Sequence, residues 1–495
     1  MPDLLVDIET ARDGTPLYQR IADSIRADVL AGRLHRGERV PSTRSLAREL
    51  KVNRNTVAQA YDQLIAEGFL AGKHGSGTFV ADELPQANFS VRTAQKQQQP
   101  LRRVALANSP APPPFYQRVL APENPQPPAP GYLDLRLGAP DIDAFPLRQW
   151  RRVVGNQLLV TRRYRMNYGS AYGLQELREA IAAYLGRARG IDCTHRNVLI
   201  TSGSQQGLWL ATSLLVGAGD QVLMEDPGYL GAASIFRAVR ADLRPVPVDS
   251  EGAQPAAVAR MLEKGVRPKL LHLTPSHQYP TGVSLSAGRR MEMLELAARH
   301  GFMIVEDDYD SEFRYEGRPL RALAGIDQSG VVIYVGSFSK VMYPSLRVGF
   351  VVAPDWLIEA MVGLRWHIDF MPPMLESAAL AQFIADGDFE RHLRRMRSQY
   401  ADKRKALVDV LHDKLPGVAP ATLPPGGMKL LLNVPPKLTR EQARERAHKA
   451  GVRVYDQSAC HFEPGKAPNV LTIGFTSLPL AQVVEAGERL AAAWT

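Results

Sequence analysis

Hydrophobic residues near the N-terminus recur with the spacing of helices. Ile21 and Ile25 lie on one face of the first predicted helix, which Gly32 ends. Two further helices are predicted over residues 42–50 and 55–67, each with apolar residues on its inner face. Because only a few residues separate these two helices, the pattern predicts a helix-turn-helix.

Residues 69–80 have a different pattern, with two short apolar runs on either side of a basic, glycine-rich tip. This pattern predicts a β-hairpin. Gly75 and Gly77 allow the tip to approach a sugar-phosphate backbone closely, and His74 or Lys73 can enter a groove of a duplex. We therefore expect a hairpin wing beside the helix-turn-helix.

From Leu133 onward, apolar runs of strand length alternate with amphipathic runs of helix length. Such alternation is typical of an α/β fold in which helices wrap a mainly parallel sheet. In an open parallel sheet the C-terminal ends of the strands share one edge, so residues that follow the strands meet there. The polar residues that follow predicted strands are Ser204 with Gln205, Tyr229, His277, Asp307 and Lys340.

The residue types at two of these strand ends indicate a cofactor. A lysine can form a Schiff base with an aldehyde, and Lys340 follows a buried strand. Its neighbours Ser337, Ser339 and Arg347 offer hydroxyl donors and a guanidinium to a phosphate dianion. Asp307 can pair with a protonated pyridine nitrogen and keep the ring an electron sink. The cofactor that fits is pyridoxal 5'-phosphate.

Length and composition agree with a large intracellular protein. The 495 residues exceed one ordinary domain and 45% of them are hydrophobic, so two or more domains with sizeable cores are expected. Cys193 and Cys460 lie far apart without metal-ligand spacing, which argues against a disulfide scaffold and a zinc site. No apolar run is long enough to span a bilayer, and we expect a cytoplasmic protein without a membrane partner.

Charge and proline content divide the chain further. The net charge is +9, but residues 1–83 hold 11 basic against 12 acidic residues. Within residues 33–58 the count is 7 basic against 2 acidic, so the predicted helix-turn-helix is locally basic and suits an acidic partner. Residues 84–130 are rich in proline and glutamine, which predicts an extended linker before residues 131–495.

The N-terminal segment resembles the winged helix-turn-helix of GntR-type regulators from end to end. The resemblance rests on the runs PLYQRI (16–21), GERVPSTR (37–44), NRNTV (53–57) and GSGTFV (75–80). It implies that double-stranded operator DNA is contacted by Arg44, Arg54, Asn55 and Thr56, at the start of the recognition helix. Arg54 can bridge O6 and N7 of a guanine, whereas Lys51 is expected to contact only phosphate or solvent.

Residues 131–495 resemble the fold-type I aminotransferases, which carry a C-terminal small domain beside the large one. With its GntR-like head, the whole chain resembles the MocR subfamily of GntR regulators. The resemblance implies that Lys340 forms the Schiff base and Asp307 pairs with the ring nitrogen. It also implies that Tyr309 bonds the ring hydroxyl and Tyr229 stacks on the ring. The implied phosphate contacts are Ser204, Gln205, Ser337, Ser339 and Arg347, with Tyr168 of the partner subunit in a head-to-tail homodimer.

Two positions depart from the aminotransferase pattern. In place of Asn-Pro-x-Gly the chain has YPTG at 279–282, and a shifted alignment puts His277 at the asparagine position, as a further cofactor contact. Thr472 stands where aminotransferases have the arginine that clamps the substrate carboxylate. Arg453 is a candidate replacement. Because substrate positioning loses that clamp, full enzymatic turnover is not expected.

These departures rank the functions that the resemblance allows. We favour a transcription factor whose large domain senses pyridoxal 5'-phosphate itself, similar to the regulators of vitamin B6 synthesis genes. The second hypothesis is a regulator that reads an amino compound, such as an ω-amino acid, through its external aldimine with the cofactor. The third is a working aminotransferase with a DNA tether, and the winged helix argues against it.

Overall fold

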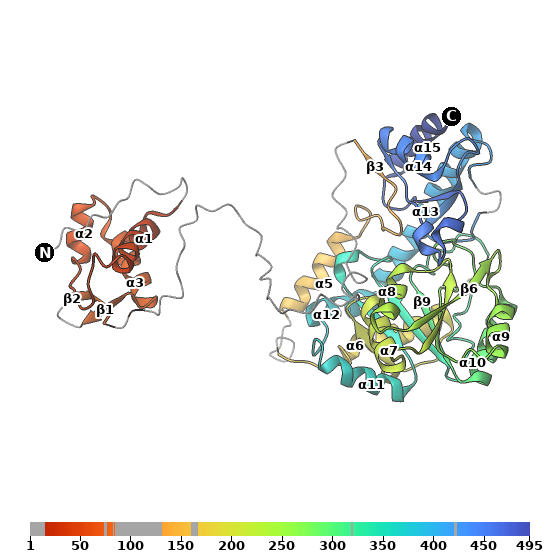
Figure 1. Cartoon of the computed structure of the whole chain (residues 1–495), viewed down its shortest axis with the longest axis horizontal. Helices are drawn as coiled ribbons and strands as arrows, with labels where there is room; N and C mark the ends of the chain where they lie inside the picture. Colours follow the sequence, from red (N-terminus) through yellow and green to blue (C-terminus); the bar gives the residue numbers. More distant parts are fainter. Residues whose placement is uncertain are drawn as a thin grey trace. The chain divides into compact units, whose positions relative to one another are not determined.

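The computed structural model describes residues 15–73, 77–82, 84, 131–159, 167–317, 320–419 and 423–495. The chain divides into two compact units, residues 1–109 and 110–495 (Figure 1). The predicted linker at 84–130 lies outside the described residues, except for Leu84. No helix within the described ranges is long and apolar enough to cross a membrane.

The N-terminal unit is the predicted winged helix-turn-helix. It contains α1 (Leu17–Leu30), α2 (Thr43–Glu49), α3 (Arg54–Ala66) and the antiparallel hairpin of β1 (Leu70–Lys73) and β2 (Gly77–Val80). Side-chain caps begin both helices of the motif, because Ser42 Oγ accepts a hydrogen bond from Ser45 N and Asn53 Oδ1 accepts one from Asn55 N. The apolar faces of the helices pack with Leu70 of the hairpin into one core.

An eight-stranded sheet organises the second unit, with the order β4-β11-β10-β9-β8-β5-β6-β7. The neighbours from β6 to β10 are parallel, which confirms the predicted α/β fold. Two strands break the pattern: β11 is antiparallel to both neighbours and β7 is antiparallel to β6. The strands are β4 (Val198–Thr201), β5 (Gln221–Asp226), β6 (Asp242–Asp249), β7 (Gly252–Ala253), β8 (Pro268–Leu273), β9 (Met303–Asp308), β10 (Val332–Ser337) and β11 (Gly349–Val352).

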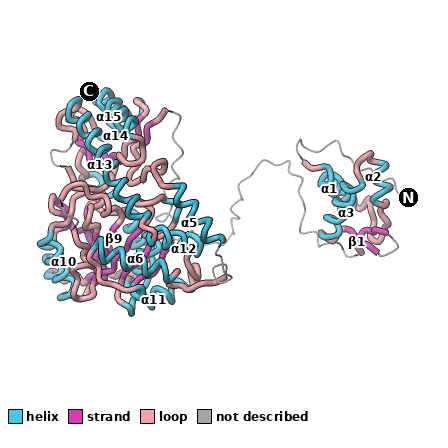
Figure 2. The backbone as a smooth tube through the Cα atoms, turned by 180° about the vertical axis from the view of Figure 1, so that it is seen from behind, coloured by secondary structure: helices cyan, strands magenta, loops and turns pink. Residues whose placement is uncertain are grey.

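Helices cover both faces of this sheet. Successive strand residues point to opposite faces, so Tyr334 shares a core with α6 and α12, whereas Val335 shares another with α7, α8 and α11. Figure 2 shows α6 and α12 on the side facing the viewer. The helices are α5 (Leu147–Leu159), α6 (Gln175–Arg189), α7 (Ser204–Leu215), α8 (Leu230–Ala238), α9 (Pro255–Glu263), α10 (Ala287–His300), α11 (Asp355–Trp366) and α12 (Met374–Ala385).

The C-terminal part forms the smaller, blue lobe of Figure 1, as predicted for a small domain. Here β12 (Lys429–Asn433) pairs antiparallel with β14 (Val470–Gly474), and β13 (Val452–Arg453) pairs in parallel with β3 (Leu133–Asp134). Its helices are α13 (Asp388–Lys414), α14 (Arg440–Lys449) and α15 (Leu480–Trp494). Short 3-10 turns are η2 (His195–Asn197), η3 (Pro344–Leu346), η4 (Ser458–Cys460) and η5 (Pro464–Lys466).

The parallel register brings several strand ends to one edge. In the ladder, Val335 of β10 lies beside Asp307 of β9, and Leu273 of β8 lies beside Glu306 of β9. The residues that follow β8 and β10 therefore leave the sheet at the level of the acids in β9. This edge holds most of the residues that the sequence singled out.

Candidate functional site

A cavity of about 150 Å³ lies at this edge, between the sheet and the C-terminal lobe. Both parts of the unit contribute walls, since Met428 and Lys429 come from the segment that begins β12. The lining residues are Leu137, Gly138, Ser204, Tyr229, Tyr279, Asp307, Tyr309, Asp310, Lys340, Met428 and Lys429. Five of the eleven cofactor residues proposed from the sequence are among them: Ser204, Tyr229, Asp307, Tyr309 and Lys340.

Lys340 extends from the turn after β10 into this cavity. Its amine packs against Gly138, where a Cβ atom would lie 3.3 Å from Nζ and where φ is +57°, so a larger residue is disfavoured both sterically and by its backbone. Burial lowers the pKa of the Lys340 ammonium, and the charges of Asp310 and Asp307 oppose that shift. Burial thus favours the neutral amine, which is the form that attacks an aldehyde.

Asp307 faces the same cavity from the end of β9 with its side chain almost fully buried. Its Oδ2 lies 3.5 Å from Nε2 of His272, and its buried Oδ1 has no hydrogen-bond partner among the residues that the structure describes. A buried carboxylate oxygen without a partner is costly, so the site has a strong acceptor that a ring N–H would satisfy. This is the observation that fits a protonated pyridine nitrogen.

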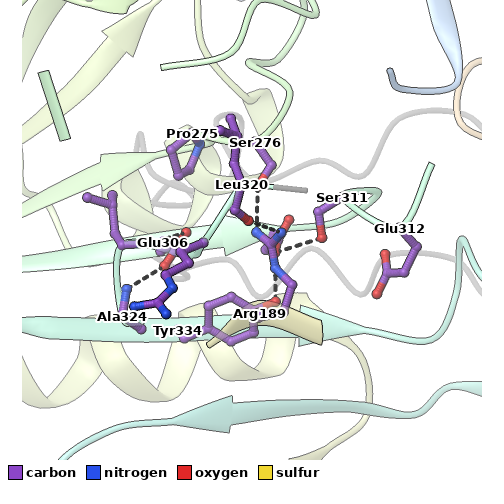
Figure 3. Close-up of polar contacts among 12 residues, drawn as sticks. Arg189, Pro275, Ser276, Glu306, Ser311, Glu312, Leu320, Ala324 and Tyr334 are labelled. Atoms are coloured by element: carbon purple, nitrogen blue, oxygen red, sulfur yellow. Dashed lines mark hydrogen bonds and ion pairs between the residues drawn. The ribbon is translucent and has the colours of Figure 1, made fainter. Parts of the chain in front are cut away.

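A buried polar network around Arg189 fixes the end of β9 (Figure 3). Arg189 at the end of α6 makes a 2.7 Å ion pair with Asp308, which also accepts hydrogen bonds from the hydroxyls of Tyr334 and Ser311. Burial raises the pKa of Asp308, but the charge of Arg189 and the hydrogen bonds from Tyr334 and Ser311 together outweigh it, so the pKa lies below its usual value. The strand end is therefore held by charge pairing as well as by the sheet.

Glu306, another acid of this strand, does not line the cavity. Its two carboxylate oxygens accept hydrogen bonds from the amides of Leu323 and Ala324, each at 2.9 Å (Figure 3). Both oxygens therefore hold the backbone of the segment that leads into β10. Asp307 is the acid of β9 whose carboxylate reaches the cavity.

The residues proposed for the phosphate gather near the start of α7. Ser204 is the first residue of that helix, whose free N–H groups and dipole favour an anion. Gly203 precedes it with φ of +93°, and a Cβ there would lie 2.9 Å from Nη2 of Arg347. Arg347 donates to the carbonyl of Ser202 at 2.6 Å, so its guanidinium lies beside the helix start. The structure brings an arginine and a helix N-terminus together, as phosphate binding requires.

The other proposed polar contacts of this region are partly engaged with each other. Gln205 Nε2 donates to the hydroxyl of Tyr229 at 3.1 Å, and Ser337 Oγ accepts from the amide of Ser339 at 3.2 Å. The first bond orients the Tyr229 ring, which lines the cavity. The phosphate roles of all five residues stay predictions: Ser204, Gln205, Ser337, Ser339 and Arg347.

Tyr309 and His277 have partners that the sequence did not suggest. The Tyr309 hydroxyl donates to the carbonyl of His277 at 2.7 Å and accepts from Nζ of Lys429 at 2.6 Å. The His277 ring is buried against Asp310, with Nδ1 to Oδ1 at 2.8 Å, and does not line the cavity. A phenol has a single O–H donor, so Tyr309 reaches a ring hydroxyl as donor only by releasing that carbonyl. Both cofactor roles stay predictions.

Two further residues lie away from this cavity. The Tyr168 ring is 79% exposed and lies 6.0 Å from the ring of Phe370, a position that leaves it open to a partner subunit. Arg453, the candidate substitute for a carboxylate clamp, rests over the ring of Tyr455 and is not among the lining residues. Thr472 is buried in β14 opposite Leu431.

Lys429 was missed by sequence reasoning although it lies in the middle of the site. It begins an apolar strand in the run MKLLLN, and a lysine at a strand position flanked by buried residues is the signal that could have identified it. No family motif marks it, so its apolar neighbours in this run are the one signal that the sequence offers.

The N-terminal unit presents the residues proposed for DNA. Arg44 in α2, with Arg54 and Asn55 at the start of α3, are exposed, and Thr56 is half-buried. In the described part of the chain, the Arg44 and Arg54 side chains have no ion pair that would hold them away from phosphate. Gly77 opens β2, where φ is +113°. His74 and Gly75 lie outside the described residues.

Family models match both units. The model of bacterial regulatory proteins of the gntR family matches residues 17–80, and that of aminotransferase class I and II matches residues 132–490. A curated relative in Rhizobium meliloti, "Probable rhizopine catabolism regulatory protein MocR", is 37% identical over 79% of this chain and 76% of its own. The chain belongs to the MocR subfamily of GntR regulators.

Other relatives agree with this MocR assignment. The transcriptional regulator TauR of Rhodobacter capsulatus is 31% identical over 96% of both chains. Among solved structures, the α-aminoadipate aminotransferase LysN of Thermus thermophilus, complexed with N-(5'-phosphopyridoxyl)-L-leucine, has a TM-score of 0.67 at 30% identity and covers 74% of this chain and 92% of its own. The kynurenine aminotransferase of Pyrococcus horikoshii has a TM-score of 0.68 at 29% identity, over 73% and 90%. The predicted fold-type I architecture is confirmed.

The DNA surface gives a first prediction. Replacing Arg54 with alanine should weaken binding to the true operator by about 1 to 3 kcal/mol more than binding to random duplex, because a base contact is lost. The matched control is Lys51→Asn, since Lys51 has a φ of +54° that asparagine tolerates. This control should weaken binding to the operator and to random duplex by the same amount. Fluorescence titrations at fixed salt measure the difference, and equal behaviour of the two variants contradicts the base-reading role of Arg54.

Proposed function

We propose that this MocR-type regulator binds operator DNA through its N-terminal unit and adjusts that binding according to the state of a pyridoxal 5'-phosphate site in its large unit. The single observation that carries the proposal is the buried Asp307 Oδ1, which finds no hydrogen-bond partner in the described part of the chain, in the cavity that also holds the Lys340 amine. An exposed basic helix-turn-helix on the same chain supplies the output.

The residues present fit the cofactor. Pyridoxal 5'-phosphate supplies an aldehyde that condenses with a lysine amine and a ring nitrogen that withdraws electrons when protonated. Lys340 would hold the aldehyde carbon, Asp307 the ring nitrogen and Tyr229 the ring face. Ser204 and Arg347 would hold the phosphate at the start of α7. Tyr168 of a second subunit would complete the phosphate site in a head-to-tail homodimer.

The cofactor itself is the signal that we favour, with vitamin B6 synthesis genes as the target. An aminotransferase clamps its substrate carboxylate with an arginine, and Thr472 stands at that position here. None of the described residues that line the cavity is an arginine. The site therefore has side chains suited to every part of the cofactor but lacks the arginine with which an aminotransferase holds an amino acid.

The second candidate is a regulator that reads an amino compound which takes the place of Lys340 on the cofactor. One observation favours it: Lys429 puts a second cation into the same cavity. Arg347 and the start of α7 would hold the cofactor phosphate, which would leave this cation for another anion.

The proposal is tested by coupling between the two units. Pyridoxal 5'-phosphate should change the operator affinity of the full-length protein by about 1 to 3 kcal/mol, the usual size of an allosteric coupling. Fragment 1–83, which carries the DNA-binding core, should show no change. Titrations of both proteins on one duplex at fixed salt, with and without the cofactor, measure this. Pyridoxine 5'-phosphate, which lacks the aldehyde, is the matched ligand control.

Two results would separate the candidates. If the cofactor alone leaves operator affinity unchanged but an added amine shifts it, the amino-compound reading replaces the sensing of the cofactor. If neither changes operator affinity, footprint or transcription from the target promoter, the large unit is not a ligand sensor.

A further inference from the structure

Lys429 is a buried lysine at the junction of the two parts of the large unit. It begins β12 and its residue is 5% exposed. Nζ donates a 2.6 Å hydrogen bond to the hydroxyl of Tyr309 and lies 4.1 Å from the centroid of the Tyr279 ring. It also lies 4.7 Å from the centroid of the Tyr309 ring. The ammonium is therefore held by two tyrosines, through the ring face of Tyr279 and the hydroxyl of Tyr309, at the wall of the cavity that contains Lys340.

Within the described residues, no carboxylate forms an ion pair with this ammonium. Asp310, whose charge raises the pKa of Lys429, is itself bound to His277 at 2.8 Å. Burial has the larger effect and lowers the pKa of Lys429 to about 8. The amine is consequently still mostly protonated near neutral pH, and its charge lacks a counter-charge.

A second lysine shows what this protein does elsewhere with a buried ammonium. Lys403 in α13 is 4% exposed, nearly the same as Lys429. Its Nζ makes a 2.7 Å ion pair with Asp141 and donates a 3.0 Å hydrogen bond to the carbonyl of Thr476. Lys403 is thus a paired structural lysine. Lys429 has the same burial cost without the pair, and its amine faces a cavity.

We propose that Lys429 binds the acid group of a small effector that carries both a primary amine and a carboxylate or sulfonate. This inference rests on the amino-compound form of the proposed function. The effector amine would take the place of the Lys340 amine on the cofactor: a C=N bond to the effector nitrogen forms as the C=N bond to Lys340 breaks, and the two hydrogens of the effector amine pass to Lys340, which leaves as a free amine. The acid group would then supply the counter-charge that Lys429 lacks.

The assignment accounts for Thr472. With the clamp arginine absent from β14, recognition of an acid group passes to the neighbouring strand β12, where Lys429 pairs with Gly474 in the ladder. A lysine is a point charge without the bidentate fork of arginine, so it accepts carboxylates and sulfonates in more than one geometry. The charge of the effector and the distance between its amine and its acid group therefore determine which effectors bind, rather than a planar, bidentate contact with an arginine.

The test uses the full-length protein loaded with pyridoxal 5'-phosphate. Glycine, 3-aminopropanoate and 4-aminobutanoate are each titrated beside the amine that lacks the acid: methylamine, ethylamine and propylamine. The absorption band of the lysine-bound cofactor and titration calorimetry report binding. The best acid-bearing amine should bind at least about 10-fold more tightly than its analogue, as expected for a hydrogen bond between charged groups.

Variants of Lys429 decide whether this residue is responsible. Lys429→Met should remove the preference for the acid-bearing amine while the cofactor band remains, and Lys429→Arg should restore most of it. Lys437→Met, at an exposed lysine outside the cavity, should behave as the wild type. As a measure independent of ligand, Lys429→Met should keep or raise Tm because a buried unpaired charge is removed. Lys403→Met should lower Tm because it leaves Asp141 unpaired.

Several outcomes overturn the inference. It fails if the wild type shows no preference for acid-bearing amines, or if Lys429→Met keeps that preference. It also fails if Lys429→Met weakens binding of the cofactor and leaves the preference for acid-bearing amines unchanged, since Lys429 then contacts the cofactor rather than the effector. The proposed function would survive each of these failures on two observations. The cofactor band would still depend on Lys340, and the cofactor would still change operator affinity. Absence of that band in the wild type would instead contradict the proposed function.

Discussion

Lys340→Ala should abolish the absorption band of lysine-bound pyridoxal 5'-phosphate and leave the protein folded. The band requires an amine bonded to the aldehyde carbon, and the Lys340 amine lies in the cavity beside Asp307. The fold should tolerate the change because the Lys340 side chain has no hydrogen bond or ion pair within the described residues. Absorption spectra with added cofactor measure the loss, and circular dichroism checks the fold.

Lys429 makes this experiment sharper, because it is a second buried amine in the same cavity. Its Nζ is committed to the Tyr309 hydroxyl at 2.6 Å, so we expect it not to replace Lys340. Borohydride reduction followed by peptide mass analysis shows which lysine carries the cofactor. In the wild type the label should be found on Lys340 and in Lys340→Ala it should vanish. A label on Lys429 in either protein would contradict the assignment of Lys340.

The strand ends of the large unit were predictable for a simple physical reason. Runs such as residues 198–201 and 332–337 are apolar on both faces, as strands covered by helices on each side must be. Parallel strands end at one edge, so the polar residues after them were expected to converge. The cavity contains Ser204, Tyr229 and Lys340, from three of those strand ends.

The direction of β11 was not predictable, because an apolar run has the same pattern in either direction and the direction depends on how the chain returns after β10.

Features that depend on side-chain partners were not predictable either. Tyr309 was expected to be available to a cofactor, yet its hydroxyl is engaged by His277 and Lys429. Lys429 reads in the sequence as one lysine among many. Its proposed role depends on the tyrosine rings that surround it and on the lack of an ion-paired acid among the described residues.

The helix-turn-helix was predictable for a different reason. Its end signals are local, because Ser42 and Asn53 cap α2 and α3 through bonds within three residues. The apolar spacing then identifies the inner face of each helix, and the exposed face with Arg44 and Arg54 follows by exclusion. Which bases this face reads is a property of the DNA complex and is not written in the spacing.

Asp307→Ala should weaken cofactor binding strongly while Lys340 is still present. The pyridinium would lose its counter-charge in a buried site, and loss of one partner of a buried charge pair costs about 2 to 5 kcal/mol. That corresponds to a reduction in affinity of at least about 30-fold. Asp307→Asn should show most of the same loss, since it keeps the shape of the side chain and removes the charge. Equilibrium titration of each variant with pyridoxal 5'-phosphate, followed by absorption, measures these affinities.

Glu306→Gln is the matched control, because it removes a charge one residue away on the same strand. Glu306 accepts the amides of Leu323 and Ala324 with both oxygens, so its loss should lower Tm and leave the affinity of the folded protein for the cofactor nearly unchanged. The opposite order, with wild-type affinity in Asp307→Ala and a large loss in Glu306→Gln, would mean that Asp307 does not hold the ring nitrogen. The buried Oδ1 of Asp307 would then need another partner, and the fit of the cavity to the cofactor would lose its main support.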